Sequence, residues 1–241
     1  MTFVAQFFQT LSYVILPLML AIVLHEYAHG WVANYYGDDT ARSQGRLTLN
    51  PLAHIDPFGT IVMPLLCLLL FPGGFLFGWA KPVPVTPGRL RNPRRDMALV
   101  AAAGPAMNLV LAIASGLFLS LLLFIDPTLK ASWPPQPGSE PRQDLLGMLL
   151  LPLVAMALFS IMINTLLFAF NLLPIPPLDG GRILVSILPL RSALTLSRLE
   201  PYGMFIILGL FLMDSHVPII STIIGTVFHL VTTSIISNVV L

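Results

Sequence analysis

Charged residues are scarce in this sequence of 241 residues. Asp, Glu, Lys and Arg make up 10% of the chain, whereas soluble domains carry roughly 25%. Apolar residues account for 56%, and the mean hydropathy is +0.86. This composition excludes an ordinary water-soluble protein and indicates an integral membrane protein whose solvent is largely lipid.

Cysteine and a surplus of basic residues are also missing. Cys67 is the single cysteine and lies in an apolar stretch, so the chain has no intramolecular disulfide and no CxxC metal motif. Twelve basic residues balance eleven acidic ones, and no basic run is interleaved with aromatics, which excludes nucleic-acid binding. No Lys or Arg precedes Arg42, so the first apolar stretch lacks the start of a secretory signal and is expected to remain as a membrane span.

Apolar windows near the length of a membrane span recur along the chain. A helix needs about 20 residues to cross the hydrocarbon. Windows of this kind cover residues 8–35, 97–125, 145–173 and 217–241, and a shorter apolar stretch covers 202–213. We therefore predict one domain over residues 1–241, an all-α polytopic membrane protein with about five or six transmembrane helices.

The apolar stretch 58–79 does not fit a simple span. Four helix-breaking residues interrupt it: Pro64, Pro72, Gly73 and Gly74. A broken or re-entrant element therefore fits this stretch as well as a straight helix does. Residues 78–85 read GWAKPVPV, and prolines at alternate positions are typical of an extended edge strand, although a proline-rich loop fits them equally well. We expect a short re-entrant or β-strand element here.

The segment HEYAH inside the first window carries metal chemistry. His25 and His29 are four residues apart, so on a helix both imidazoles lie on one face and can bind one zinc ion. Glu26, beside them, can act as the general base that takes a proton from an activated water. Ionisable groups at membrane depth are costly and are functional by default. A zinc site therefore explains this segment better than three unrelated polar residues do.

A third zinc ligand must come from elsewhere in the chain, because a catalytic zinc ion usually has three protein ligands and one open position. Five acidic residues lie near apolar spans: Asp56, Asp96, Asp126, Asp179 and Asp214. Asp179 stands out because it follows the prolines that end the window 145–173 and precedes two glycines, which permit close backbone approach. Taken alone, however, LDGG is better explained as a tight turn. We assign His54, between turn signals, to a structural role.

Three segments together resemble the signatures of the site-2 proteases, a family of intramembrane zinc metalloproteases. HEYAH lies in the window 8–35, AAGPAMN opens the window 97–125, and NLLPIPPLDGG ends the window 145–173, in the family's order. HExxH alone is moderately specific, whereas its combination with N-x-x-P-x-x-x-L-D-G in an apolar chain is highly specific. The resemblance covers most of residues 24–182.

The resemblance implies a ligand set and an activity. His25, His29 and Asp179 would bind Zn²⁺, and Glu26 would be the catalytic acid and base. The expected activity is hydrolysis of peptide bonds in or near the transmembrane segments of membrane-protein substrates. The sequence departs from better-known family members because it contains no PDZ-like or nucleotide-sensing domain, which leaves open how it is regulated and how it excludes intact proteins.

The resemblance also implies substrate-binding residues. Asn171 would contact the substrate backbone near the scissile bond as an oxyanion donor, with bonding to a neighbouring helix as its alternative. Asn108, in GPAMN, is a second substrate-binding candidate, for which helix packing is an equal alternative. Residues 78–85 are the candidate for the strand that pairs with an unwound substrate.

The distribution of basic residues predicts the topology independently. If His25 and Asp179 bind one ion, the windows 8–35 and 145–173 must run in the same direction and the window 97–125 in the opposite one. Eight basic residues then share one side, namely Arg42, Arg46, Lys81, Arg89, Arg91, Arg94, Arg95 and Arg182, against Lys130 and Arg142 on the other. This positive-inside pattern predicts a multi-pass protein of a prokaryotic plasma membrane, with its active site towards the cytoplasm.

Two other readings stay open. A divalent-metal transporter would also place His and Asp inside the bilayer, but it would spread polar residues along a pathway and would give Glu26 no task. An inactive scaffold descended from a protease is the second alternative, and the complete set of His25, His29 and Asp179 argues against it.

Overall fold

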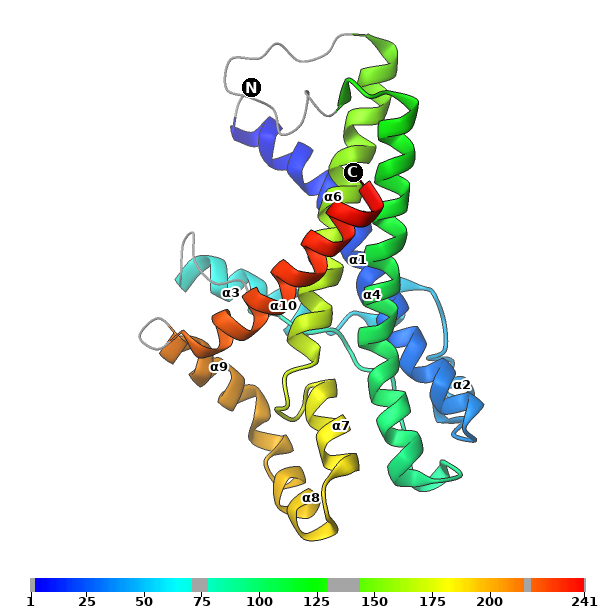
Figure 1. Cartoon of the computed structure of the whole chain (residues 1–241). Helices are drawn as coiled ribbons and strands as arrows, with labels where there is room; N and C mark the ends of the chain where they lie inside the picture. The colour runs from blue at the N-terminus through cyan, green and yellow to red at the C-terminus, as the bar shows by residue number, and fades with distance from the viewer. Residues whose placement is uncertain (1–2, 71–77, 130–143, 215–217, 241) are drawn as a thin grey trace. The chain divides into compact units, whose positions relative to one another are not determined.

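The computed structural model describes residues 3–70, 78–129, 144–214 and 218–240 (Figure 1). Within these ranges the chain forms helices joined by short turns, and none of these residues lies in a β-strand. Four helices are long and apolar enough to cross a membrane: Ser12–Tyr35, Pro93–Ile125, Leu145–Asn171 and Ile220–Asn238. The chain is thus an all-α, multi-pass integral membrane protein, as predicted.

The helices belong to two compact units. The first comprises Met1–Ala21, Asn108–Leu172 and Met204–Leu241, and the second comprises Ile22–Met107 and Leu173–Gly203. Two long helices, α1 (Phe3–Tyr35) and α4 (Pro93–Ile125), contribute one part to each unit. The segments HEYAH and LDGG, far apart in sequence, consequently lie in the same unit.

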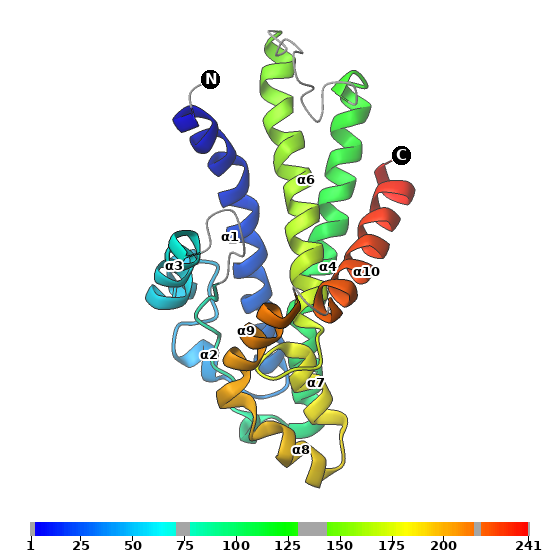
Figure 2. The same cartoon turned by 90° about the vertical axis from the view of Figure 1, so that its left-hand side faces the viewer.

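Helices of the first unit pack through apolar side chains. This unit contains α6 (Leu145–Asn171), most of α9 (Gly203–Asp214), α10 (Ile219–Ile235) and the turn Ile236–Val240. Its core joins α4, α6 and α10 through buried residues that include Leu119, Leu122, Val154, Ile161 and Ile235. Within this unit α6 runs in the same direction as the N-terminal part of α1, and α4 runs in the opposite direction (Figures 1 and 2). These directions are the ones expected if His25 and Asp179 bind one ion.

Buried polar side chains also join the helices of the first unit. The Asn108 amide on α4 donates to Asn164 Oδ1 on α6 at 2.9 Å and to the Ala21 carbonyl of α1 at 3.3 Å. Further along, the Ser115 hydroxyl donates to the Ser160 hydroxyl at 2.7 Å. Because lipid cannot satisfy such groups, hydrogen bonds between helices stabilise a membrane protein. Asn108 therefore has a packing role in the structure.

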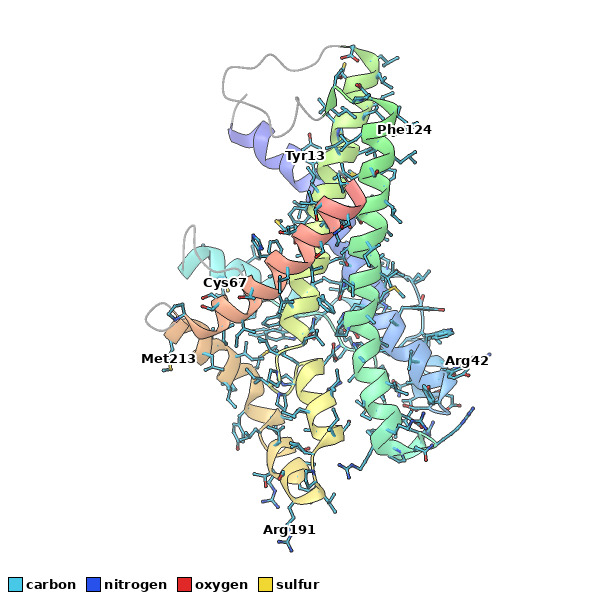
Figure 3. The ribbon with its side chains drawn as sticks, viewed as in Figure 1. Tyr13, Arg42, Cys67, Phe124, Arg191 and Met213 are labelled. Carbon is cyan, nitrogen blue, oxygen red and sulfur yellow. The ribbon has the colours of Figure 1, made fainter. Side chains whose placement is uncertain are left out.

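The second unit consists of short elements around the ends of α1 and α4. These elements are α2 (Thr40–Ser43), the 3₁₀ turns Pro51–His54, Pro87–Arg89 and Glu200–Tyr202, the π-helical turn Pro57–Val62, α3 (Met63–Leu70), α7 (Asp179–Ile187) and α8 (Leu190–Ser197). Residues 78–86 run as an extended segment that belongs to no strand. Helices α7 and α8 follow one another as a hairpin (Figure 1). Arg42 and Arg191 project outward from this unit (Figure 3).

The two ends of the interrupted apolar stretch 58–79 meet. The Trp79 N–H donates to the Gly59 carbonyl at 3.1 Å, and the Thr60 hydroxyl donates to the Trp79 carbonyl at 2.9 Å. Gly59 leaves room for the Trp79 indole, which a Cβ at this position would overlap. One complete crossing would instead separate these ends by about 30 Å. The stretch therefore cannot be a single straight span.

Large apolar side chains remain exposed on the membrane helices. Phe124 on α4 is 84% exposed, and Met213 on α9 is also exposed; both project outward from the ribbon (Figure 3). Water would disfavour this exposure, whereas lipid tails do not. The exposed surface thus agrees with the apolar composition.

The polar contact between α4 and α6 leads to a testable prediction. We expect Asn108→Ala and Asn164→Ala to be coupled by about 0.5–1.5 kcal/mol in a double-mutant cycle, the range of interhelical hydrogen bonds in membranes. Thermal unfolding in detergent measures this coupling. Asn108→Ala combined with Thr226→Ala, whose exposed hydroxyl donates to the Thr222 carbonyl of its own helix, should be additive. Equal coupling in both cycles would contradict the assignment.

Candidate metal centre

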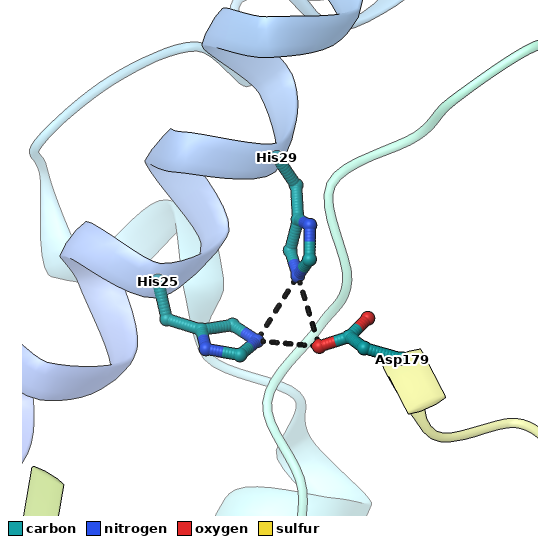
Figure 4. A group of neighbouring side chains, drawn as sticks. All are labelled: His25, His29 and Asp179. Carbon is teal, nitrogen blue, oxygen red and sulfur yellow. Dashed lines mark hydrogen bonds and ion pairs between the residues drawn. The ribbon is translucent and has the colours of Figure 1, made fainter. Parts of the chain in front are cut away.

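Two histidines of α1 and one aspartate of α7 converge on one point (Figure 4). The Nε2 atoms of His25 and His29 lie 3.0 Å apart, because a spacing of four residues stacks their side chains on one helix face. Asp179 Oδ2 lies 3.2 Å from the first Nε2 and 3.3 Å from the second. All three side chains are buried. The segments HEYAH and LDGG, which are far apart in sequence, thus meet in space.

Local sequence explains why Asp179 reaches this point. The prolines after α6 cannot continue a helix, and α7 begins at Asp179 after an extended Leu178. Gly181 lets the first turn of α7 pack closely on the preceding loop, because a Cβ there would lie 2.8 Å from the Ile175 carbonyl oxygen and closer still to other backbone atoms. A larger residue at position 181 would displace the start of α7 and its carboxylate.

Helix α4 completes the wall of the site. His29 Nδ1–H donates to the Val100 carbonyl at 2.7 Å, which leaves Nε2 as the nitrogen with a free lone pair for a metal. Gly104 lies one turn further along α4. A Cβ at this position would lie 2.6 Å from His25 Nε2 and closer still to His29 Nε2, so glycine leaves room for both imidazoles. Both features of α4 favour close approach of the two imidazoles to a common ion.

The donor atoms fit a zinc ion. Ligands of a tetrahedral zinc ion with bonds of about 2.0 Å lie about 3.3 Å apart, close to the separations of 3.0, 3.2 and 3.3 Å. Asp179 Oδ2 is buried and accepts no well-directed hydrogen bond within the described part of the chain. Two nitrogens and a carboxylate oxygen are ligands that zinc accepts. The described residues contain no second group of three such ligands within reach of one ion.

The carboxylate of Asp179 is also in the protonation state that a metal requires. Burial raises the pKa of this carboxyl, but its interactions with His25 and His29 lower it by more. The net pKa therefore lies below the ordinary value, and the group is ionised near neutrality. A cation at this point would replace contacts that the two imidazoles now supply.

Glu26 lies beside the histidines and contacts the extended segment 78–86. Its Oε2 accepts a hydrogen bond from the Val83 N–H at 2.7 Å. Its side chain is half-buried, so water can reach it. The candidate general base and the candidate substrate-pairing segment are therefore in direct contact.

Two residues that the sequence analysis did not single out hold this segment. The buried Asp38 carboxylate accepts hydrogen bonds from the N–H groups of Thr40 and Thr86. Arg46 Nη2 donates to the carbonyls of Lys81 and Pro82, at 3.0 and 3.2 Å. Both residues lie in the polar stretch after α1, where nothing in the sequence indicates which backbone groups they bind.

The remaining candidates make other contacts in the structure. His54 is buried, and its Nε2 donates to the Thr48 carbonyl at 2.9 Å, which agrees with its assignment to a structural role. The Asn171 amide, at the end of α6, donates to the Leu167 carbonyl of its own helix at 3.0 Å. Asn171 and Asn108 belong to the first unit, and their substrate contacts stay predictions.

Comparison with known proteins gives a family assignment. The profile of peptidase family M50 matches residues 13–213. YwhC of Bacillus subtilis, named a zinc metalloprotease, is 40% identical over 206 residues, which cover 83% of this chain and 80% of that protein. Rip2 of Mycolicibacterium smegmatis, named likewise, is 30% identical over 205 residues, 82% of this chain and 65% of Rip2. No solved structure matches the chain.

The close approach of α4 to the histidines predicts the effect of a methyl group. Gly104→Ala should lose most bound zinc, because the new Cβ would occupy the space of both Nε2 atoms. Metal analysis of the purified protein measures this loss. Gly225→Ala, in α10 with no atom within 4 Å of its Cβ position, should keep zinc. Equal zinc content in both variants would contradict the geometry.

Proposed function

The chain belongs to peptidase family M50 and is a site-2-type zinc metalloprotease, and we propose that His25, His29 and Asp179 hold its zinc ion. The observation that carries this assignment is the convergence of three buried donor atoms at 3.0 to 3.3 Å. These separations suit the edges of a tetrahedron around zinc. The fourth position then stays open for substrate or water.

We assign Glu26 as the acid and base of peptide hydrolysis. Zinc, when bound, polarises the scissile carbonyl and acidifies water. Glu26 takes a proton from the attacking water and delivers it to the leaving amine. The Val83 N–H holds Oε2 at 2.7 Å, which leaves Oε1 to face the water. This hydrogen bond holds one carboxylate oxygen and leaves the second for the reaction.

The extended segment is the proposed pairing site for an unwound substrate. Its first half is paired with its own unit, since Trp79 and Lys81 donate to the carbonyls of Gly59 and His54. Among the described residues, no hydrogen bond reaches the carbonyls of Val83 and Val85 or leaves the Val85 N–H. An extended peptide could use these groups as a strand partner. These groups begin with the carbonyl of Val83, the residue whose N–H binds Glu26.

We further propose that the stretch 58–79, of which residues 71–77 lie outside the described ranges, is re-entrant, because its two ends are joined. With the short α9 counted beside the four long helices, the chain would have about five or six membrane elements. Because α1 and α4 contribute to both compact units, we treat residues 1–241 as one catalytic domain. Asn171 and Asn108 are retained as candidate substrate contacts near the scissile bond.

The proposed location is a prokaryotic plasma membrane, with the active site towards the cytoplasm. The second unit, which holds the site, carries ten Lys or Arg residues against seven Asp or Glu. Basic residues gather on the cytoplasmic side of membrane proteins. The substrates would be transmembrane proteins whose cleaved bond lies near that face.

Measuring zinc content and cleavage separately in two variants tests the roles of Glu26 and His29. Glu26→Gln should keep zinc but reduce cleavage by at least about 100-fold, because general acid and base catalysis contributes that much or more. His29→Ala should lose both. The assay uses protein purified in detergent and a library of synthetic transmembrane peptides, with products identified by mass spectrometry. Substantial cleavage by pure Glu26→Gln protein would refute the role of Glu26.

A further inference from the structure

A cleft of about 660 Å³ lies within the second unit, beside the extended segment. Its walls are residues 82–85 and Pro87, the start of α4, the loop before α7, and the α7–α8 hairpin with the turn that follows it. This volume is within the roughly 300–1,000 Å³ of pockets that bind small ligands. The cleft is therefore large enough for a few residues of an extended peptide.

One wall of the cleft touches the candidate catalytic centre. Val83 lines it and also donates to Glu26 at 2.7 Å. Pro176 and Arg182, which line another wall, lie three residues before and after Asp179. A peptide whose scissile bond reaches Glu26 and Asp179 would thus extend into this cleft. It is a candidate for the residues on one side of that bond.

The chemistry of the walls suits an extended peptide. Pro82 and Pro84 have no N–H, and among the described residues the carbonyls of Val83, Pro84 and Val85 have no hydrogen-bond partner. This wall therefore offers acceptors to the N–H groups of a bound chain. Met97 gives the start of α4 an apolar side chain in the cleft. Such walls accept backbone and apolar side chains but do not distinguish one charge from another.

Charge in the cleft comes from two arginines that differ in their partners. Arg182 forms an ion pair with Glu200, with 3.1 Å between Nη2 and Oε1. Arg94 donates only to the carbonyls of Ser186 and Leu188 at the end of α7, and no carboxylate of the described residues neutralises it. Arg94 is exposed. The cleft consequently carries one uncompensated positive charge.

We propose that this cleft binds the extended substrate segment on the cytoplasmic side of the scissile bond, and that Arg94 favours Asp or Glu there over Lys or Arg. The inference rests on the proteolytic function and the orientation proposed above. An acidic side chain opposite Arg94 gains an ion pair, whereas a basic side chain meets like charge. Arg94 is thus a specificity-determining residue.

Such a cleft would select substrates by the charge of their cytoplasmic flank. Cytoplasmic flanks of membrane proteins are enriched in Lys and Arg, so a cationic cleft would bind most of them poorly. Proteins with an acidic residue beside the cleaved bond would bind better. The charge of this flank would then separate substrates from the many membrane proteins that must stay intact.

Sets of three peptides, one set for each flank position, test the inference. Each is a synthetic transmembrane peptide that the wild-type protein cleaves, with Asp, Asn or Lys at successive positions on the cytoplasmic side of the bond. We expect kcat/KM for Asp to exceed that for Lys by about tenfold at one position, the effect of about 1.4 kcal/mol. High salt should reduce this ratio.

Variants of Arg94 assign the preference to that residue. Arg94→Lys should keep the preference for Asp, Arg94→Gln should remove it, and Arg94→Glu should invert it. Arg95→Gln removes a neighbouring exposed charge outside the cleft and should leave the ratio unchanged. Zinc content and the melting temperature show whether each variant is folded. The peptide series assayed with the wild-type protein tests the charge preference without any protein variant.

The results distinguish the charge preference, the role of Arg94 and the proteolytic function. If the wild-type protein cleaves the Asp, Asn and Lys peptides with equal kcat/KM at every position, the charge preference is overturned and the protease assignment stays intact. An equal loss on all peptides in Arg94→Gln, with an unchanged ratio, overturns the role of Arg94 in selection and shows that it only supports α7. No cleavage of any library peptide by zinc-loaded wild-type protein overturns the proposed function and this inference with it.

Discussion

The approach of two imidazole nitrogens and one carboxylate oxygen to within 3.0 to 3.3 Å of one another is the constraint on which the site depends. Such a buried cluster is stable when a cation occupies its centre. Residues next to the three ligands allow these atoms to come so close. Prolines end α6 before Asp179, Gly181 lets α7 start close to the preceding loop, and Gly104 leaves space beside His25 and His29. None of these residues needs to bind the ion itself.

Helix α4 connects both sources of ligands within the second unit. Its Val100 carbonyl orients His29, and its Arg94 binds the last carbonyls of α7, the helix that begins at Asp179. A cation at the C-terminal end of a helix also interacts favourably with the helix dipole. Arg94 therefore has two consequences: it supports the helix that carries a ligand, and it leaves a positive charge in the adjoining cleft. The substrate series separates these consequences because only the second depends on the charge of the peptide.

The extended segment 78–86 links catalysis to substrate binding. Asp38 and Arg46 fix its backbone, and Val83 lies where the segment passes Glu26. Trp79 and Lys81 are paired before Val83, and the carbonyls of Val83 and Val85 have no partner among the described residues, so a bound peptide would begin its contacts at the catalytic base. A helical substrate hides its peptide bonds in its own hydrogen bonds, so an accessible edge at this position would favour the unwound form.

The sequence by itself determined the membrane class, the long helices, and the pairing of His25 with His29, because hydropathy and a spacing of four residues act locally along one helix. It named Asp179 only through resemblance, since no local rule joins residues so distant in sequence. Tertiary structure decided that Asp179 meets the histidines, that the ends of 58–79 touch, and that Val83 binds Glu26. It also revealed the cleft beside Arg94. These features depend on backbone groups and side chains brought together by folding, and a backbone N–H or carbonyl looks the same at every position of a sequence.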